Sequence, residues 1–386
     1  TAIPLDNIEL EEARRRGVPC LHRAEMLAAV CARAEALGVA GTHGKTTTSS
    51  MLRAVLDGAG LAPSYVIGGE VRDTGAGASW TGGRFLVVEA DESDGTYRRL
   101  PLTGAIVTNI DVDHLDHFGD FDALVADFEL FVAGVAGPVA VCLDDPHLSR
   151  MAAGIGRTGL VGYGSGPSAD VRWSEVVARG SEMEFVVSGR FGRRRARLPL
   201  RGDHNVANAC GALALATSLG VDIDPAVEAL GVFGGVGRRF DVIGSAEGAT
   251  FVDDYAHLPR EIEAVLRAAR RSGEWSRVVA VFQPNRFNRM AAMSGDYADA
   301  FAEADVVVIT DIYSSGTAPI PGVTGHLVVE AVRRAHPSTP VEWVPRRADL
   351  PAAVSGLVRP GDVCVSMGCG DIEHLPREIL ELRSHA

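Results

Sequence analysis

The segment GTHGKTTT (41–48) follows directly on the apolar run Leu37–Ala40 and constrains the fold more than any other part of the chain. An apolar run, a glycine-bracketed turn and then Lys45 predict a strand, a tight loop and the start of a helix. Backbone N–H groups at such a helix N-terminus hold phosphate oxygens, and the lysine reaches the β and γ groups. Thr46 has the position of the hydroxyl that ligates Mg²⁺ in phosphate-binding loops. The usual first glycine of GxxxxGK[ST] is replaced by Val39.

The alternative for this segment is a plain strand–turn–helix whose first turn is capped by a threonine. The complete GKT sequence, placed between a predicted strand and a predicted helix, favours nucleotide binding. We therefore expect the loop and the first helical residues to contact the cofactor: Gly41, Thr42, His43, Gly44, Lys45, Thr46 and Thr47.

Short apolar runs alternate with helical patterns along nearly the whole chain, which predicts an α/β fold with parallel sheets. The predicted strands are Phe85–Glu89, Ala105–Thr108, Val139–Leu143, Val278–Phe282, Val306–Ile309 and Val363–Met367. Alternating runs within residues 170–200 predict a small antiparallel piece set into this α/β body.

At 386 residues the chain is long enough for two or three domains. The glycine-rich GVFGGVGRRF (231–240) predicts a domain boundary, and we divide the chain into residues 1–36, 37–236 and 237–386. Residues 1–36 have the character of the tail of an earlier α/β unit. The chain begins at Thr1 rather than at methionine, so we expect a missing N-terminal segment.

Charge and composition exclude several classes of function. With 37 basic and 50 acidic residues the net charge is −13, which argues against nonspecific binding to nucleic acid or anionic membranes. No apolar run approaches the roughly 18 residues that span a bilayer, and no signal peptide is present. Six scattered cysteines without a CxxC spacing predict free, mostly buried thiols in a reducing cytosol. The oligomeric state is not predicted.

Two later segments carry acidic and imidazole groups that suit a metal and phosphates. VVEADESDGTY (87–97) delivers carboxylates to a sheet edge, and Glu89 should be partly enclosed because it follows two valines. For Glu92 and Asp94 a solvated acidic turn is the reasonable alternative. In VTNIDVDHLDHFGD (107–120), Asp113 and His114 could face the same phosphates, whereas His117 is treated as an ordinary hydrogen-bonding residue.

These three stretches make the sequence resemble the Mur ligase family over essentially its whole length. The resemblance is nearest to the family members that add the first amino acid. It extends to SYVIGGE (64–70), NIDVDHLDHFGDF (109–121), LDDPHL (143–148), GDHNVANA (202–209), GVGRRFDVIG (235–244), VDDYAHLPREI (252–262), VFQPNRFNR (281–289), DIYSSGTAPIPGV (311–323) and SMGCGDI (366–372).

The resemblance implies three parts: a remnant of a UDP-sugar-binding domain (1–36), a central ATP-binding domain with a parallel sheet (37–236) and a Rossmann-like C-terminal ligase domain (237–386). The family's early glycine-rich nucleotide-sugar motif is absent here. The implied reaction is phosphorylation by ATP of the lactyl carboxylate of UDP-N-acetylmuramate, followed by attack of L-alanine on the acyl phosphate. It implies a cytoplasmic enzyme of peptidoglycan precursor synthesis.

The resemblance also implies residue roles. Lys45 would neutralise the transferring phosphoryl group, Thr46 and Glu89 would hold one Mg²⁺, and His114 a second metal. Catalytic residues would be Lys45, Glu89, His114 and Arg239; further nucleotide contacts would be His204, Asn205, Asn208, Arg239 and Asp254; and the substrate contacts would be Tyr255, His257, Arg286 and Arg289.

Each of these assignments has a structural alternative. A helix cap with surface amides would account for Asn205, simple solvation for Arg238, and a pair of surface arginines for Arg286 and Arg289, which we expect to share one helical face. Leu258 and Asn285 stand where the family has histidine and leave the choice of amino acid open.

Three other functions remain open from sequence. A muropeptide-recycling ligase would attach a whole peptide to UDP-N-acetylmuramate, and a simple P-loop hydrolase or kinase would turn over without an amino acid. A ligase-derived scaffold would bind ATP without catalysis.

Overall fold

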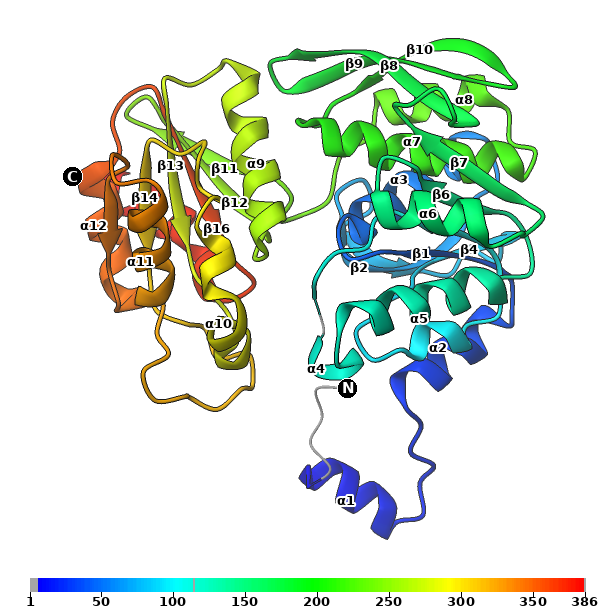
Figure 1. Cartoon of the computed structure of the whole chain (residues 1–386), viewed down its shortest axis with the longest axis horizontal. Helices are drawn as coiled ribbons and strands as arrows, with labels where there is room; N and C mark the ends of the chain where they lie inside the picture. Colours follow the sequence, from blue (N-terminus) through cyan, green and yellow to red (C-terminus); the bar gives the residue numbers. More distant parts are fainter. Residues whose placement is uncertain (1–5, 114, 385–386) are drawn as a thin grey trace. The chain divides into compact units, whose positions relative to one another are not determined.

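The computed structural model describes residues 6–113 and 115–384 and shows two compact units (Figure 1). The first unit consists of the described residues up to Val177 together with Glu184–Pro199 and His204–Val236. The second consists of Ala178–Met183, Leu200–Asp203 and the described residues from Gly237 onward. Each unit is built on its own β-sheet.

The first sheet has ten strands in the order β10-β9-β8-β7-β6-β5-β1-β4-β2-β3. Strand β1 lies between β4 and β5 and is parallel to both, with Val39 opposite Glu89 and opposite Ile106. The strands are β1 (Glu35–Ala40), β2 (Ser64–Val71), β3 (Ala76–Ser79), β4 (Phe85–Glu89), β5 (Leu102–Val107), β6 (Val139–Cys142), β7 (Leu160–Gly164), β8 (Val171–Arg179), β9 (Glu182–Gly189) and β10 (Gly192–Leu198).

Helices lie on both faces of this sheet (Figure 1), so its central strands read as continuous apolar runs. Strand β4 shows this clearly, because its first four residues, Phe85 to Val88, are buried. The helical segments are α1 (Ile8–Arg15), α2 (Arg23–Cys31), α3 (Lys45–Gly58), η1 (Thr96–Arg99), α4 (Leu115–Phe118), α5 (Phe121–Gly134), α6 (Pro146–Gly154), α7 (Asp203–Ser218) and α8 (Ile223–Gly231).

The second sheet has six strands in the order β11-β12-β16-β13-β14-β15. From β12 to β15 neighbouring strands are parallel, so their carboxyl ends meet at one edge. The strands are β11 (Asp241–Ala246), β12 (Ala249–Asp254), β13 (Arg277–Phe282), β14 (Val306–Ile309), β15 (Val341–Trp343) and β16 (Asp362–Met367).

Two apolar clusters in the second unit contain residues of the sheet and of its helices. Helix α9 shows how its sequence directs this packing: Pro259 starts it, Gly273 ends it with a left-handed φ of 69°, and Ile262 and Leu266 point one face into the core. The helical segments are α9 (Pro259–Ser272), α10 (Phe287–Met293), η2 (Ser294–Tyr297), α11 (His326–Ala335), η3 (Arg347–Asp349), α12 (Leu350–Leu357), η4 (Asp371–His374) and α13 (Leu375–Ser384).

The α/β class predicted from the sequence is confirmed, and each predicted strand is present with bounds within a few residues. The alternating segment 170–200 forms β8, β9 and β10, which are set into the α/β body as predicted and continue the first sheet to its edge. All six cysteines are free and four of them are buried, as predicted. In the described part of the chain, no helix is long and apolar enough to cross a membrane.

Candidate functional site

The phosphate loop connects the end of β1 to the start of α3, and its glycines determine its shape. Gly41 has a φ of 124° and Gly44 a φ of 81°, both in the region that favours glycine. A Cβ on Gly41 would lie only 2.1 Å from Thr108 Oγ1. The helix begins at Lys45 with Gly44 as its N-cap, and no side chain caps it. The threonine-cap alternative is therefore wrong, and a helix N-terminus without a side-chain cap is the kind of site at which proteins bind phosphate.

Residues at the end of β5 hold the loop from one side. The backbone N–H of His43 donates to Asn109 Oδ1 at 2.8 Å, and Thr108 Oγ1 donates to the His43 carbonyl at 2.6 Å. The His43 ring lies 3.0 Å from Asp111 Oδ2 through its Nε2. Asn109 and Asp111 thus hold the loop in place. Their position in VTNIDVDH does not predict this role, because the sequence alone does not show that β5 neighbours β1.

Lys45 lies in a buried ion pair with Glu92. Its Nζ is 2.8 Å from Glu92 Oε1 and 2.9 Å from Oε2, and it also donates to the carbonyls of Gly41 at 2.8 Å and Thr42 at 3.2 Å. The Glu92 side chain is 1% exposed, so a solvated acidic turn at this residue is wrong. Strand β4 lies beside β1 with Glu89 opposite Val39, so the residues after Glu89 follow the strand that neighbours the one leading into the loop.

The pKa of both groups is raised, which favours the charged form of Lys45 and the neutral form of Glu92. Burial lowers the pKa of Lys45 and the charges of Glu92, Asp91 and Glu89 raise it, with a net rise. Burial raises the pKa of Glu92, and Lys45 lowers it, again with a net rise. We take the pair as charged, because both carboxylate oxygens lie within 2.9 Å of the ammonium, a geometry in which the ion pair is well compensated.

Thr46 and Glu89 come together as a pair of oxygen donors beside Lys45. Thr46 Oγ1 donates to Glu89 Oε2 at 3.1 Å, and the N–H of Gly68 donates to the same oxygen at 2.9 Å. Glu89 is partly enclosed, as its position after two valines predicts. A hydroxyl and a carboxylate next to a phosphate loop fit Mg²⁺, which binds through few protein ligands and substrate phosphates.

No further metal ligands gather in the described residues. Within 6–113 and 115–384, no group of three or more His, Cys, Asp or Glu side chains is placed to hold a metal ion. A metal at Thr46 and Glu89 would therefore take its remaining ligands from phosphate and water. His114, predicted as a second metal ligand, lies outside the described residues, and its role stays a prediction.

Helix α7 brings a distant amide to the loop. Asn208 is 8% exposed, and a Cβ on Gly44 would lie 2.8 Å from its Oδ1, so its side chain packs directly against the loop glycine. Its Nδ2 donates to Asn205 Oδ1 at 3.2 Å. Asn208 is thus not a surface amide, whereas His204, in the first turn of the helix, is exposed. The predicted nucleotide contacts of these three residues stay predictions.

The predicted substrate residues of the second unit converge at the carboxyl ends of its parallel strands. Asp254 ends β12 and is 3% exposed, with its two oxygens accepting from the N–H groups of Phe240 and Ala256 at 2.7 Å each. Burial raises its pKa, against the opposing charge of Arg239. In this geometry Asp254 organises backbone, and a direct nucleotide contact stays a prediction.

Two neighbouring arginines behave differently. The guanidinium groups of Arg238 and Arg239 each lie 5.2 Å from the Tyr255 ring centroid, but Arg238 is also held by hydrogen bonds. Arg238 is not merely solvated: its Nε donates to Asp253 at 2.9 Å, its Nη2 to the Gly368 carbonyl at 2.8 Å, and its Nη1 lies 2.7 Å from Glu373. Arg238 therefore ties the start of this unit to its sheet.

Tyr255 and His257 follow β12 and pack edge-to-face, with ring centroids 5.3 Å apart. The His257 Nδ1 lies 3.1 Å from the Tyr255 carbonyl and 3.3 Å from Glu261. The His257 backbone is held as well, because Tyr297 donates its hydroxyl to the His257 carbonyl at 2.7 Å. These contacts fix both rings at the sheet edge.

Arg286 and Arg289 follow β13, but they do not share a helical face. Arg286 is the N-cap of α10 with a left-handed φ of 62°, outside the helix, because its N–H is drawn to the Tyr313 carbonyl at 2.9 Å. Arg289 lies inside the helix, is 9% exposed and donates to Asn285 Oδ1 at 2.9 Å. Burial raises the pKa of the Cys369 thiol. The hydrogen bond from Ser315 and the charges of Arg289 and Arg286 lower it, but burial has the larger effect. No local pattern in the sequence predicts Cys369 at this position.

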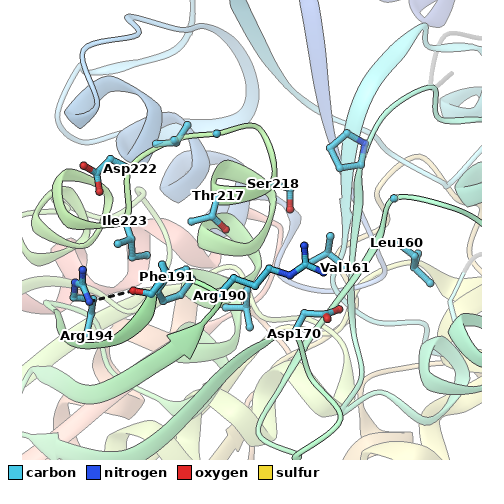
Figure 2. Close-up of a pocket in the computed structure, with 15 residues that line it drawn as sticks. Leu160, Val161, Asp170, Arg190, Phe191, Arg194, Thr217, Ser218, Asp222 and Ile223 are labelled. Atoms are coloured by element: carbon cyan, nitrogen blue, oxygen red, sulfur yellow. Dashed lines mark hydrogen bonds between the residues drawn. The ribbon is translucent and has the colours of Figure 1, made fainter.

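A separate cavity of about 850 Å³ lies at the amino ends of β6 and β7, in the first unit (Figure 2). In Figure 2 Arg190 extends across it toward Val161. Its acids are already engaged by backbone, since Asp170 accepts from Gly162 at 2.9 Å and Asp222 caps α8. The phosphate loop lies at the carboxyl end of β1, so we do not assign phosphate chemistry to this cavity.

Fold and site together define an α/β enzyme with a nucleotide-phosphate loop on one unit and an arginine-bearing sheet edge on the other. Two family descriptions match it: the Mur ligase middle domain over residues 39–216, and the Mur ligase, glutamate ligase domain over residues 238–370. The chain belongs to the Mur ligase family and is a ligase.

Individual relatives agree with this assignment. The chain is 42% identical over 99% of its length to a UDP-N-acetylmuramate–L-alanine ligase of Bradyrhizobium sp. (strain ORS 278), of which it covers 84%. It is 44% identical over 96% of its length to a protein of the same name from Phenylobacterium zucineum (strain HLK1), of which it covers 79%. Its structure resembles that of UDP-N-acetylmuramate-alanine ligase MurC from Thermotoga maritima, with a TM-score of 0.83, 28% identity and coverage of 100% of this chain and 84% of that one.

Proposed function

We propose that this chain joins L-alanine to the lactyl carboxylate of UDP-N-acetylmuramate at the expense of ATP, in the cytoplasm. The observation that carries the proposal is the 42% identity, over 99% of the chain, to a ligase named for this reaction. The buried Lys45, with Thr46 and Glu89 beside it, supports the use of a nucleotide triphosphate.

The chemistry needs activation, because a carboxylate is a poor electrophile and oxide a poor leaving group. Transfer of the γ-phosphoryl group to a carboxylate oxygen yields ADP and an acyl phosphate. Lys45 supplies positive charge to the transferring group, and the N–H groups at the start of α3 hold its oxygens. Thr46 and Glu89 would hold Mg²⁺, which when bound adds charge neutralisation at the phosphates.

The second step forms the amide. The neutral amine of L-alanine attacks the carbonyl carbon, the new C–N bond replaces the C–O bond, and inorganic phosphate leaves while the amine loses a proton. In the second unit, Tyr255 and His257 would line the alanine site, and Arg286 and Arg289 would bind carboxylate groups, which guanidinium recognises well. Arg239 would add charge for the phosphates, and Asp254 would support it.

The alternatives fit the relatives less well. A simple hydrolase or kinase would not need an amino acid, and a scaffold would not need a lysine, a hydroxyl and carboxylates together at the phosphate loop. A peptide-attaching ligase shares the phosphate loop, but the Bradyrhizobium and Phenylobacterium relatives are named for L-alanine. No feature of the described residues favours any of the three.

The test is a phosphate-release assay with the full-length protein, ATP and UDP-N-acetylmuramate, screened against L-amino acids and against an L-alanyl peptide. We expect release to depend on both the sugar nucleotide and an amino acid, with L-alanine giving the highest kcat/KM. Release with the peptide alone would support the recycling ligase. Binding of ATP without any release under all these conditions would refute the ligase proposal.

A further inference from the structure

Glu92 is the buried partner of the phosphate-loop lysine. Its carboxylate touches the ammonium with both oxygens, and Lys45 is the only charged partner of its side chain among the described residues. The Lys45 side chain is 13% exposed, so water solvates it little. Without Glu92 the ammonium would lose the anion that compensates its burial.

All the donors of Lys45 are engaged in this arrangement. An ammonium has three N–H donors, and here the acceptors are the carbonyls of Gly41 and Thr42 and the two oxygens of Glu92. A phosphate oxygen that binds Lys45 therefore has to replace one of them. The carboxylate resembles the phosphate most closely in charge, and both bind an ammonium by charge-assisted hydrogen bonds.

From this geometry we propose that Glu92 is a positioning residue: it holds Lys45 in the empty loop, gives it up to the incoming nucleotide phosphate and takes it back as ADP leaves. The inference rests on the proposed use of ATP by this loop. Glu92 then competes with the nucleotide, weakening its binding and speeding its release. The ion pair keeps the conformation of the loop when no nucleotide is bound, and the competition speeds the dissociation of ADP after turnover.

Asp91 provides a matched control. Its carboxylate accepts from the N–H and the Oγ of Ser93, at 3.2 and 3.0 Å, and it lies 3.5 Å from Arg23. It raises the pKa of Lys45 only through its charge, without a hydrogen bond. Asp91→Asn therefore removes one nearby negative charge and leaves the contacts of the ammonium in place.

The experiment compares wild type, Glu92→Gln, Glu92→Asp and Asp91→Asn by binding and release of a fluorescent ADP analogue with Mg²⁺. Glu92→Gln should bind ADP about tenfold more tightly and release it correspondingly more slowly, since a hydrogen bond to a charged group is of that order. Its KM for ATP should fall, and kcat should not rise. Asp91→Asn should stay within about twofold of wild type, because Asp91 makes no hydrogen bond to Lys45 and its charge is screened by solvent and by the nearby Arg23.

The conservative variant Glu92→Asp keeps the charge on a shorter side chain, and its ADP affinity should fall between wild type and Glu92→Gln. It also keeps the test valid if Glu92→Gln does not fold. Unchanged or weaker ADP binding by a folded Glu92→Gln would overturn the competition, and so would an equal gain in Asp91→Asn. If wild type itself fails to bind ADP, the proposed function of the loop fails as well; if it binds and only the Glu92 pattern is absent, this inference fails alone.

Discussion

Replacing Gly68 with alanine would test the placement of Glu89 without altering any charged group. Gly68 lies in β2, where its N–H donates to Glu89 Oε2 at 2.9 Å. A Cβ at this position would lie 2.8 Å from that oxygen and 3.2 Å from the Glu89 Cδ. The carboxylate therefore has to move away from Gly68, which alters its hydrogen bond with Thr46.

The size of the effect follows from the bond that is lost. A hydrogen bond to a charged group contributes about 1.5–3 kcal/mol, and a shifted carboxylate should retain part of it. We take about 1.4 kcal/mol as the net loss at the metal, which corresponds to about tenfold in binding. The Mg²⁺ concentration for half-maximal activity should thus rise about tenfold. The residues of the phosphate loop around Lys45 are not altered by the substitution.

The measurement is a Mg²⁺ titration of amino-acid-dependent phosphate release at saturating ATP. The control is Gly134→Ala at the end of α5, where a Cβ meets nothing within 4 Å. A Gly68→Ala protein that melts like wild type yet shows an unchanged Mg²⁺ requirement would remove Glu89 from the metal. A lower kcat at saturating Mg²⁺ with no change in half-saturation would lead to the same conclusion.

Three further predictions concern other parts of the site. Lys45→Ala should lower kcat by at least about a hundredfold through loss of charge at the phosphoryl group, and near-normal ligation in the release assay would contradict the loop's role. Arg289→Ala should raise the KM for L-alanine at least about tenfold with a smaller change in kcat, and an unchanged KM would exclude it from the pocket. Burial, against the charge of Arg238, raises the pKa of Asp253 from 3.8 to about 6. The folded state therefore binds the proton more tightly than the unfolded state, and folding stability falls as the pH rises. Between pH 4 and 7 the free energy of unfolding of wild type, measured with denaturant, should fall by up to about 3 kcal/mol relative to that of Asp253→Asn. Parallel pH profiles of the two proteins would refute this.

The elements of the fold were largely predictable because their signals are local. Each buried strand reads as a short apolar run, and Phe85–Glu89 and Val306–Ile309 coincide with β4 and β14 to the residue. The loop was predictable for the same reason, since its two glycines and its lysine lie close together along the chain. Local patterns also placed Glu89 correctly, because a carboxylate after buried valines has to be partly enclosed.

What the sequence could not supply was the order of the strands, and the misplaced residues depend on it. The local sequence around Glu92 is consistent with a solvated turn, and only the position of β4 next to β1, where β2 would follow in chain order, brings Glu92 to Lys45. Arg238 was consistent with solvation until β12 and the turn after β16 brought Asp253 and Gly368 to it. Arg286 looked helical by spacing, and only its bond to Tyr313, 27 positions away, draws it out of the helix.

Leu258 and Asn285 stand where the family has histidine, and both lie near the predicted amino-acid site. Both side chains are buried in the structure. Leu258 is 3% exposed, where an apolar side chain replaces histidine without adding a group to the sheet edge. Asn285 is also 3% exposed, and its Oδ1 accepts from Arg289, so it still supplies an acceptor for that guanidinium. Neither change adds charge at the edge, where Tyr255, Arg239 and Arg286 remain in place. Neither substitution therefore changes the order of the substrates that we propose to test, in which L-alanine comes first because the relatives are named for it.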